Sequence, residues 1–249
     1  MSRNKLSVSV AMAAYNGDRY IKSQIETIMC QLKESDELVI SLDPSTDATE
    51  QIIRDFAKKD SRIHFLYGKG EGLVCNFSNA IRHCKNDIIF LCDQDDLWKE
   101  DKVECILSYF HDTSVEVVMH DAEIINENNE CLNQSFMDMR GCRTGILKNI
   151  LKNSYIGCCM AFRKELRKYI LPFPENIPMH DQWIGLIGEI TGKNVMIHKQ
   201  LIGYRRHGQN VSSESHAGFF QMLSWRICLI SNLLKFYLKF KKFEGRKEQ

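Results

Sequence analysis

Apolar runs typical of buried strands alternate with stretches of helical periodicity through the first hundred residues of this chain. The strands are predicted over residues 6–13, 37–42, 62–67 and 87–92. Helices are predicted between them over 18–32, from a capping box at Asp47 and Glu50 onward, and over 74–84. This β-α-β-α-β-α-β order predicts an α/β domain with a mainly parallel sheet flanked by helices.

The second half of the chain has a less regular pattern. Strands are predicted over 115–120, 155–162 and 195–198, with a hairpin over 126–134. Residues 172–178 contain three of the four prolines and predict a stiff, extended loop, because each proline fixes its φ angle. A helix is predicted to follow over 183–191.

Polar clusters follow three of the predicted strands at the point where each strand ends. They comprise residues 14–16 (AYN), 43–45 (DPS) and 93–96 (DQDD). Parallel strands present their carboxyl ends at one edge of a sheet, where ligands of open α/β folds bind. We therefore expect these clusters to converge on one site.

The 93–96 cluster places three carboxylates within four residues, and these repel one another unless they are solvated or bridged by a cation. Hard cations such as Mg²⁺ and Mn²⁺ prefer such oxygen ligands. A solvated acidic turn before a helix near Lys99 is the alternative. The position directly after a buried strand favours the metal site.

Three further features each allow two interpretations. Asp43 is either a turn residue or an acceptor for a ligand N–H or hydroxyl. Asp181, which follows the proline loop, is either a helix N-cap or a general base held on a rigid element. Residues 204–210 (YRRHGQN) form either a basic surface loop or a group that holds a diphosphate or a metal.

Two nucleotide-binding motifs are missing where they would be needed. The glycines of residues 68–72 (GKGEG) do not form a P-loop and predict instead a flexible turn near the ligand. No G-x-G-x-x-G follows the first strand, which removes the main argument for a dehydrogenase.

The charge of the chain is divided unevenly along its 249 residues. The total of +1 argues against a general electrostatic grip on nucleic acid. Seven basic and two acidic side chains in residues 225–249 give that segment +5 and leave −4 for the remainder. Residues 219–243 are rich in apolar side chains and predict a basic amphipathic helix, suited to an anionic membrane surface. Packing against its own domain or a second subunit is the alternative.

The ten cysteines include no C-x-x-C pair, so zinc binding has poor support. We interpret them as reduced residues of a cytosolic protein, with five in apolar runs and therefore in the core: Cys92, Cys105, Cys158, Cys159 and Cys228. No signal peptide is predicted at the N-terminus, and no apolar run reaches the ~18 residues of a spanning helix.

The ordered motifs of residues 6–213 resemble those of family-2 glycosyltransferases with the GT-A fold, particularly the bacterial rhamnosyltransferase-like branch. The matching segments are residues 8–16 (VSVAMAAYN), 42–47 (LDPSTD), 76–77 (NF), 90–98 (FLCDQDDLW), 180–183 (HDQW) and 204–211 (YRRHGQNV). Leu42 and Pro44 depart from the D-D-G pattern of the family, so one nucleoside contact is expected to be lost and the turn to be stiffer.

The resemblance implies a role for each matching position. Nucleotide and donor contacts are implied for Ala13, Tyr15, Asp43 and Asp93, with Asp43 accepting the N3–H of uracil or thymine. Asp95 would bind Mg²⁺ or Mn²⁺, with help from His207 toward the metal or the diphosphate. Asp181 would be the base that deprotonates the acceptor hydroxyl.

The resemblance implies an inverting, metal-dependent glycosyltransferase domain over residues 1–213, with a helical tail over 214–249. The donor would be a nucleoside-diphosphate sugar, such as dTDP-rhamnose or a UDP-sugar. The acceptor would be a growing surface polysaccharide or lipid-linked glycan. We expect a cytoplasmic protein that contacts the inner face of the cell membrane through the tail. A non-catalytic sugar-binding module and a metal-dependent nucleotidyltransferase are the alternatives.

Overall fold

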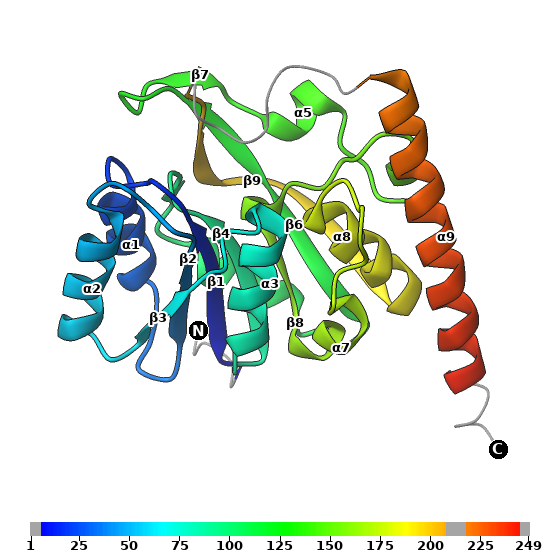
Figure 1. The fold of residues 1–249 in the computed structure, drawn as a ribbon, viewed down its shortest axis with the longest axis horizontal. Coiled ribbons are helices and arrows are strands. Elements are labelled where there is room, and N and C mark those ends of the chain that lie inside the picture. The colour runs from blue at the N-terminus through cyan, green and yellow to red at the C-terminus, as the bar shows by residue number, and fades with distance from the viewer. Residues whose placement is uncertain (1–5, 208–217, 245–249) are drawn as a thin grey trace.

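The computed structural model describes residues 6–207 and 218–244, which form one mixed sheet covered by helices (Figure 1). The first strands are β1 (Val8–Ala14), β2 (Glu37–Leu42), β3 (Ile63–Tyr67) and β4 (Ile88–Asp93). The helices between them are α1 (Ile21–Met29), α2 (Thr49–Lys59) and α3 (Leu73–His83). All four strands run parallel in the order β3-β2-β1-β4, which confirms the α/β prediction for this half.

The second half extends the same sheet with both parallel and antiparallel strands. It comprises β5 (Leu97–Trp98), α4 (Lys102–Tyr109), β6 (Val115–Ile125), β7 (Cys131–Asn133), α5 (Phe136–Arg140), α6 (Ile146–Leu151), η1 (Gly157–Cys159), β8 (Met160–Arg163), η2 (Lys164–Leu166), α7 (Arg167–Ile170), α8 (His180–Thr191), β9 (Lys193–Arg205) and α9 (Phe219–Glu244). The sheet continues from β4 through β8, β6 and β9 to β5. Strands β6 and β9 are parallel, whereas β8 is antiparallel to both of its neighbours.

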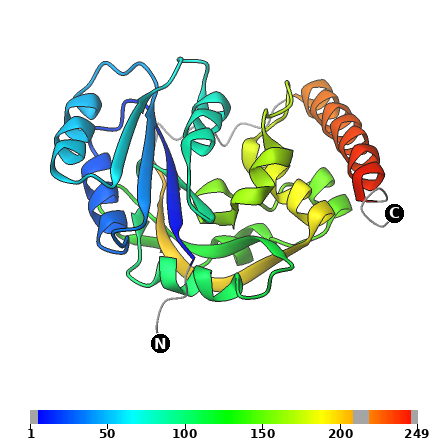
Figure 2. The same cartoon turned by 90° about the horizontal axis from the view of Figure 1, so that it is seen from below.

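Helices cover both faces of this sheet. The right-handed connections carry α1 and α2 to one face, while α3 returns across the other face and packs on β1 and β2. Helix α8 packs on β6 and β9 on the same side as α3, so these two helices flank the front of the sheet (Figures 1 and 2). This arrangement leaves the carboxyl ends of β1, β2 and β4 as one edge.

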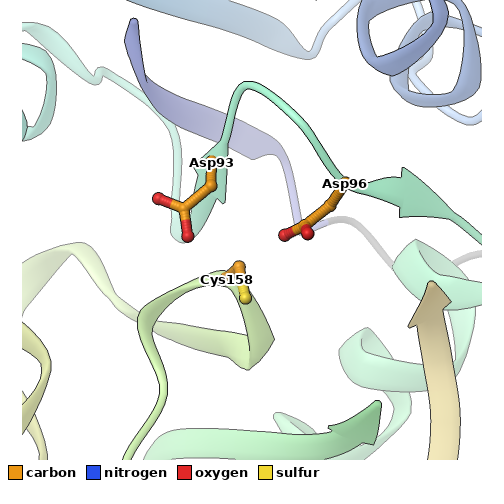
Figure 3. A group of neighbouring side chains, drawn as sticks. All are labelled: Asp93, Asp96 and Cys158. Carbon is orange, nitrogen blue, oxygen red and sulfur yellow. The ribbon is translucent and has the colours of Figure 1, made fainter. Parts of the chain in front are cut away.

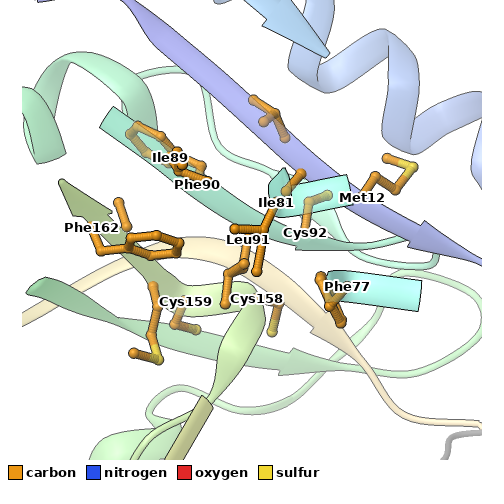
Figure 4. Close-up of a cluster of buried hydrophobic side chains, with 14 of the residues drawn as sticks. Met12, Phe77, Ile81, Ile89, Phe90, Leu91, Cys92, Cys158, Cys159 and Phe162 are labelled. Carbon is orange, nitrogen blue, oxygen red and sulfur yellow. The ribbon is translucent and has the colours of Figure 1, made fainter. Parts of the chain in front are cut away.

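The hydrophobic core surrounds the central strand β4. The five residues of β4 from Ile88 to Cys92 are fully buried, as expected for a central strand covered on both faces. Side chains from α3, β1 and β8 pack against this strand, including Phe77, Met12 and Phe162 (Figure 4).

Several boundaries differ from the sequence prediction. Residues 155–159 are a loop and a 3-10 turn, so β8 is shorter than the strand predicted over 155–162. Strands β6 and β9 are longer than predicted because they pair with each other along most of their length. The capping box is wrong: α2 begins after Ala48, and the Glu50 carboxylate bonds instead to Arg54 and Tyr67.

All ten cysteines are free thiols. Cys92, Cys158 and Cys159 are buried, as predicted, whereas Cys105 and Cys228 are only half-buried because they lie at helix surfaces.

The predicted tail helix is α9, which packs along the outer edge of the domain (Figure 2). Leu229 and Leu233 are buried, and the Tyr169 ring meets the rings of Phe236 and Phe240 edge-on. The alternative of packing on its own domain is therefore correct for this side of the helix. The predicted domain boundary at residue 213 lies outside the described residues. Within them, no helix combines the length and apolar character that a bilayer crossing requires.

Candidate active site

The three strand-end clusters meet, as the sequence predicts. Ala13 in β1 lies between Ser41 of β2 and Asp93 of β4 in the sheet register. The Asp43 N–H donates to the Ala14 carbonyl at 2.9 Å, which carries the pairing one residue beyond β2. The carboxyl ends of β1, β2 and β4 thus place Asp43 and Asp93 on either side of Ala13.

Tyr15 contributes its backbone to this edge, while its side chain is 57% exposed. The Tyr15 N–H donates to the Gln94 Oε1 at 2.9 Å, and the Gln94 Nε2 donates to the Tyr15 carbonyl at 2.7 Å. This two-bond amide contact ties the loop after β1 to the loop after β4.

Asp43 is buried beside the glycine turn of residues 68–72. The Gly70 N–H donates to the Asp43 Oδ1 at 3.0 Å, and Gly70 has a φ of +73°, a conformation that favours glycine. A Cβ on Gly68 would lie 2.2 Å from the same oxygen, so only glycine allows this approach. Asp43 therefore stabilises the glycine turn, as the turn-residue interpretation predicts. Within the described chain the Asp43 Oδ2 has no hydrogen bond, which leaves it available for a ligand donor.

The acids after β4 form a tight group with one thiol. Asp93, Asp96 and Cys158 point toward one another, with their potential ligand atoms within 4.8 Å (Figure 3). Burial, then the nearby Asp95 and Asp181 carboxylates, raise the pKa of Asp93 to about 7. Burial also raises the pKa of Asp96 well above its usual range.

Arg205 fixes the acidic turn of residues 93–96 through hydrogen bonds. Its backbone N–H donates to the Asp96 Oδ1 at 3.0 Å and its Nε to the Asp95 carbonyl at 2.8 Å. The guanidinium is buried and lies 4.6 Å from the Tyr20 ring centroid. The Asp96 Oδ2 is buried with no partner among the described residues.

The two predicted metal ligands lie together. The His207 Nε2 lies 2.7 Å from the Asp95 Oδ2, and both side chains are mostly buried. The His207 ring also stacks on Tyr20, with 5.2 Å between centroids. Residues 208–211 of the predicted closing loop lie outside the described chain.

Asp181 lies in the first turn of α8 and is not the N-cap, because the helix begins at His180 and its cap position is Met179. The Asp181 Oδ1 accepts hydrogen bonds from the Gln182 N–H at 2.5 Å and the Asn153 Nδ2 at 3.2 Å. Burial raises the pKa of Asp181 to about 6. A Cβ on Gly157 would lie 3.8 Å from the Asp181 Cβ, and the next residue, Cys158, belongs to the Asp93 group. The Asp181 carboxylate also contributes to the raised pKa of Asp93.

The side chains present suit a hard divalent cation. Neighbouring carboxylates help to raise the pKa of Asp93, and the buried Asp96 Oδ2 has no partner among the described residues. A divalent cation would stabilise this group of oxygens. Asp95 and His207 supply oxygen and imidazole donors beside it. Burial raises the pKa of the Cys158 thiol well above its usual range.

Sequence reasoning missed several residues of the site. Asp96 and Gln94 lay inside the recognised acidic cluster without an assigned role. Cys158 and Asn153 come from the irregular segment between α6 and β8, where no periodicity or motif marks them. Only the folded chain brings that segment against β4 and α8.

The mixed sheet with helices on both faces matches the GT-A-like fold. Staphylococcus aureus TarS in complex with UDP-GlcNAc superposes with a TM-score of 0.69 at 16% identity, covering 94% of this chain and 71% of TarS. Mannosyltransferase PcManGT from Pyrobaculum calidifontis, in complex with GDP-Man and Mn²⁺, gives 0.60 at 18% identity, covering 94% and 64%.

The sequence assigns the family within this fold. The family model "Glycosyl transferase family 2" matches residues 9–171, well over half of the chain. This chain belongs to glycosyltransferase family 2.

Curated relatives are similar over part of their length. The Escherichia coli protein WfgD, a UDP-Glc:alpha-D-GlcNAc-diphosphoundecaprenol beta-1,3-glucosyltransferase, is 30% identical over 67% of this chain and 64% of its own. Bacillus subtilis TuaG, a putative teichuronic acid biosynthesis glycosyltransferase, is 28% identical over 64% and 62%. The chain thus spans just under two thirds of these relatives.

Proposed function

We propose that this protein is an inverting, metal-dependent glycosyltransferase that moves a sugar from a nucleoside diphosphate to a hydroxyl of a surface polysaccharide or lipid-linked glycan. The observation that carries the proposal is the convergence of Asp43, Asp93 and Asp181 at one edge of the sheet. Membership of glycosyltransferase family 2 supports the reaction class.

Asp181 is the proposed general base. Its pKa of about 6 leaves it mainly ionised at neutral pH, yet makes it more basic than an ordinary aspartate. Hydrogen bonds from Gln182 and Asn153 fix the carboxylate at the start of α8. It would accept the acceptor proton as the acceptor oxygen attacks the sugar carbon, and one such displacement inverts that carbon.

Asp95 and His207, with the neighbouring Asp93, are the residues that would hold Mg²⁺ or Mn²⁺. Such a cation supplies neutralisation of the negative charge that develops on the departing diphosphate. The buried Arg205 keeps the acidic turn in place through Asp95 and Asp96. Ala13 and Tyr15 would present backbone to the nucleotide.

A pyrimidine nucleotide is the proposed donor carrier, because the Asp43 Oδ2 can accept the N3–H of uracil or thymine. A thermal-shift screen of UDP, dTDP, GDP and ADP with Mn²⁺ tests this choice. The proposal predicts stabilisation by UDP or dTDP and little by the purine nucleotides. Stabilisation by GDP or ADP alone would contradict the role of Asp43. A dTDP-rhamnose donor follows from the rhamnosyltransferase-like motifs, and the same screen with sugar nucleotides tests it.

The released product separates this proposal from the two alternative classes. A glycosyltransferase releases a nucleoside diphosphate from a sugar nucleotide, whereas a nucleotidyltransferase releases pyrophosphate from a nucleoside triphosphate. A binding module releases neither. Product analysis by ion-exchange chromatography distinguishes the three outcomes.

The proposal extends to contact between α9 and an anionic membrane at the inner face of the cell membrane. On the side away from Leu229, the helix exposes apolar side chains at Phe220, Leu223, Ile227, Ile230, Leu234 and Leu238. Lysines at 235, 239, 241 and 242 are also exposed. Exposed apolar surface beside basic side chains suits acidic lipid headgroups.

Vesicle sedimentation tests this contact with the full chain. Binding is expected to phosphatidylglycerol-containing vesicles and not to pure phosphatidylcholine, and to weaken with salt. An Ile227→Gln, Leu234→Gln double variant should lose binding, while Leu132→Gln, at an exposed leucine on β7, should retain it. Equal binding of the double variant would contradict the proposal. If the protein is a dimer in solution and does not bind vesicles, this face belongs to the contact with a second copy of the chain.

A further inference from the structure

A groove of about 430 Å³ lies between α3 and the proline loop that precedes α8. Its walls are formed by residues of the glycine turn, of the outer face of α3 and of the loop. The side chains that matter to its chemistry are Lys69, Glu71, Ser78, Arg82, Phe173 and Glu175. None of these residues has an assigned role in donor binding or in the chemical step.

The groove lies beside the candidate active site. At one end, Lys69 and Glu71 flank Gly70, whose N–H bonds to Asp43. At the other end, the Phe173 ring lies 6.3 Å from the His180 ring, centroid to centroid. The next residue along the chain is Asp181. The loop wall of the groove therefore packs against the residue that precedes the proposed base.

The lining combines an apolar platform with unused polar groups. Phe173 and the neighbouring prolines provide an apolar wall. The side chains of Lys69, Glu71, Arg82 and Glu175 make no hydrogen bond or ion pair with any other described part of the chain. Two cations and two carboxylates balance in charge, so the groove does not select strongly for an anion or a cation.

This chemistry matches a sugar chain. A sugar ring has an apolar C–H face that packs on an aromatic ring, and a rim of hydroxyls that both donate and accept hydrogen bonds. Carboxylates accept from hydroxyls, and Arg and Lys donate to them. A concave site with an apolar wall and a few convergent polar groups is typical of small-ligand recognition.

We propose that this groove binds the glycan of the acceptor, with Phe173 as the stacking platform and Arg82 and Glu175 as hydroxyl partners. The inference rests on the proposed glycosyltransferase function and places the acceptor glycan along the groove whose loop wall contacts the start of α8. The nucleotide base proposed at Asp43 would lie next to the Lys69 end of the groove, with the diphosphate toward Asp95 and His207.

Cys75 provides a direct probe, because it lines the groove and is exposed. Alkylation of the wild-type thiols by iodoacetamide is followed by peptide mass spectrometry, with Cys30 and Cys131 as exposed internal controls. The added probe is the glycan fraction extracted from envelopes of the cells that make this protein, alone or with UDP and Mn²⁺. The proposal predicts slower alkylation at Cys75 with glycan, and unchanged rates at the two controls.

Two results of the alkylation experiment would overturn the proposal. Unchanged Cys75 alkylation with the glycan fraction, under conditions where that fraction accepts sugar, places the acceptor elsewhere. Equal protection of Cys75 by UDP alone assigns the groove to the donor.

A kinetic comparison separates acceptor binding from the reaction itself. Phe173→Ala is expected to raise the glycan concentration for half-maximal transfer roughly fivefold, the loss expected for one aromatic contact, while UDP affinity stays unchanged. Ser78→Trp, which fills the groove, should abolish transfer but not UDP binding. Tyr109→Ala on α4 is the control for removal of a partly exposed aromatic side chain.

The failures of the two proposals are distinguishable. A wild-type protein that releases no nucleoside diphosphate from any sugar nucleotide refutes the proposed function, and the groove assignment with it. A wild-type protein that transfers sugar, with Phe173→Ala and Ser78→Trp variants that use the glycan equally well, refutes the groove assignment alone.

Discussion

Asp181 should lower the stability of the fold at neutral and higher pH, where its carboxyl group is ionised. Burial raises the pKa of Asp181 from 3.8 to about 6, so the folded chain binds this proton more tightly than the unfolded chain does. Ionisation therefore destabilises the folded state as pH rises. At 1.36 kcal/mol per pKa unit, the penalty is about 3 kcal/mol at pH 8 and under about 1 kcal/mol at pH 4.

The Asp181→Asn variant removes this penalty, since the amide stays neutral and its oxygen can still accept the Gln182 N–H. We expect its free energy of unfolding to exceed that of the wild type by about 3 kcal/mol at pH 8, with the gain shrinking toward pH 4. Urea unfolding followed by circular dichroism measures the difference. Asp138→Asn, at a carboxylate that is 77% exposed, is the control and should show no such trend.

A gain in stability that is absent at pH 8, or equal at both pH values, would refute the reasoning. It would mean that solvent reaches the Asp181 carboxylate or that a partner offsets its burial. In either case the argument that Asp181 is a more basic carboxylate than usual would fail.

Three further changes test other parts of the site and fold. His207→Ala removes the partner of Asp95 and should raise the Mn²⁺ concentration for half-maximal thermal stabilisation with UDP by about tenfold or more. An unchanged Mn²⁺ requirement would exclude His207 from the metal site. Asp43→Ala should lower the UDP affinity measured by calorimetry by about tenfold and leave the weak GDP affinity unchanged. An equal loss for both nucleotides would argue against recognition of the base by Asp43. Gly185→Ala should lower the free energy of unfolding by about 1–3 kcal/mol, because the new Cβ would lie 2.4 Å from the Tyr155 ring. Gly218→Ala is the control and should be neutral, because its Cβ would meet no atom within 4 Å.

The parallel half of the fold could be predicted because its signals are local. Each strand from β1 to β4 is a short apolar run followed by a polar turn, and strand–helix alternation dictates parallel pairing. The site residues at the strand ends, Asp43 and Asp93, could be located for the same reason.

The second half could not be predicted as well because long-range pairing shapes it. The extent of β6 and β9 comes from their mutual pairing across more than seventy residues of sequence. Residues 155–159 carry the apolar side chains of a strand but turn under β4, where Cys158 meets Asp93 and Asp96. The groove beside α3 was likewise invisible in sequence, since α3 and the proline loop are about a hundred residues apart.

Release of nucleoside diphosphate from UDP-, dTDP- and GDP-sugars, with Mn²⁺ and the envelope glycan fraction present, tests the central claim most directly. The wild-type protein should release nucleoside diphosphate from a pyrimidine sugar nucleotide and transfer its sugar to glycan. Asp181→Asn, though more stable, should lose this transfer. Equal transfer by Asp181→Asn, or no release by the wild type from any of these donors, would contradict the account.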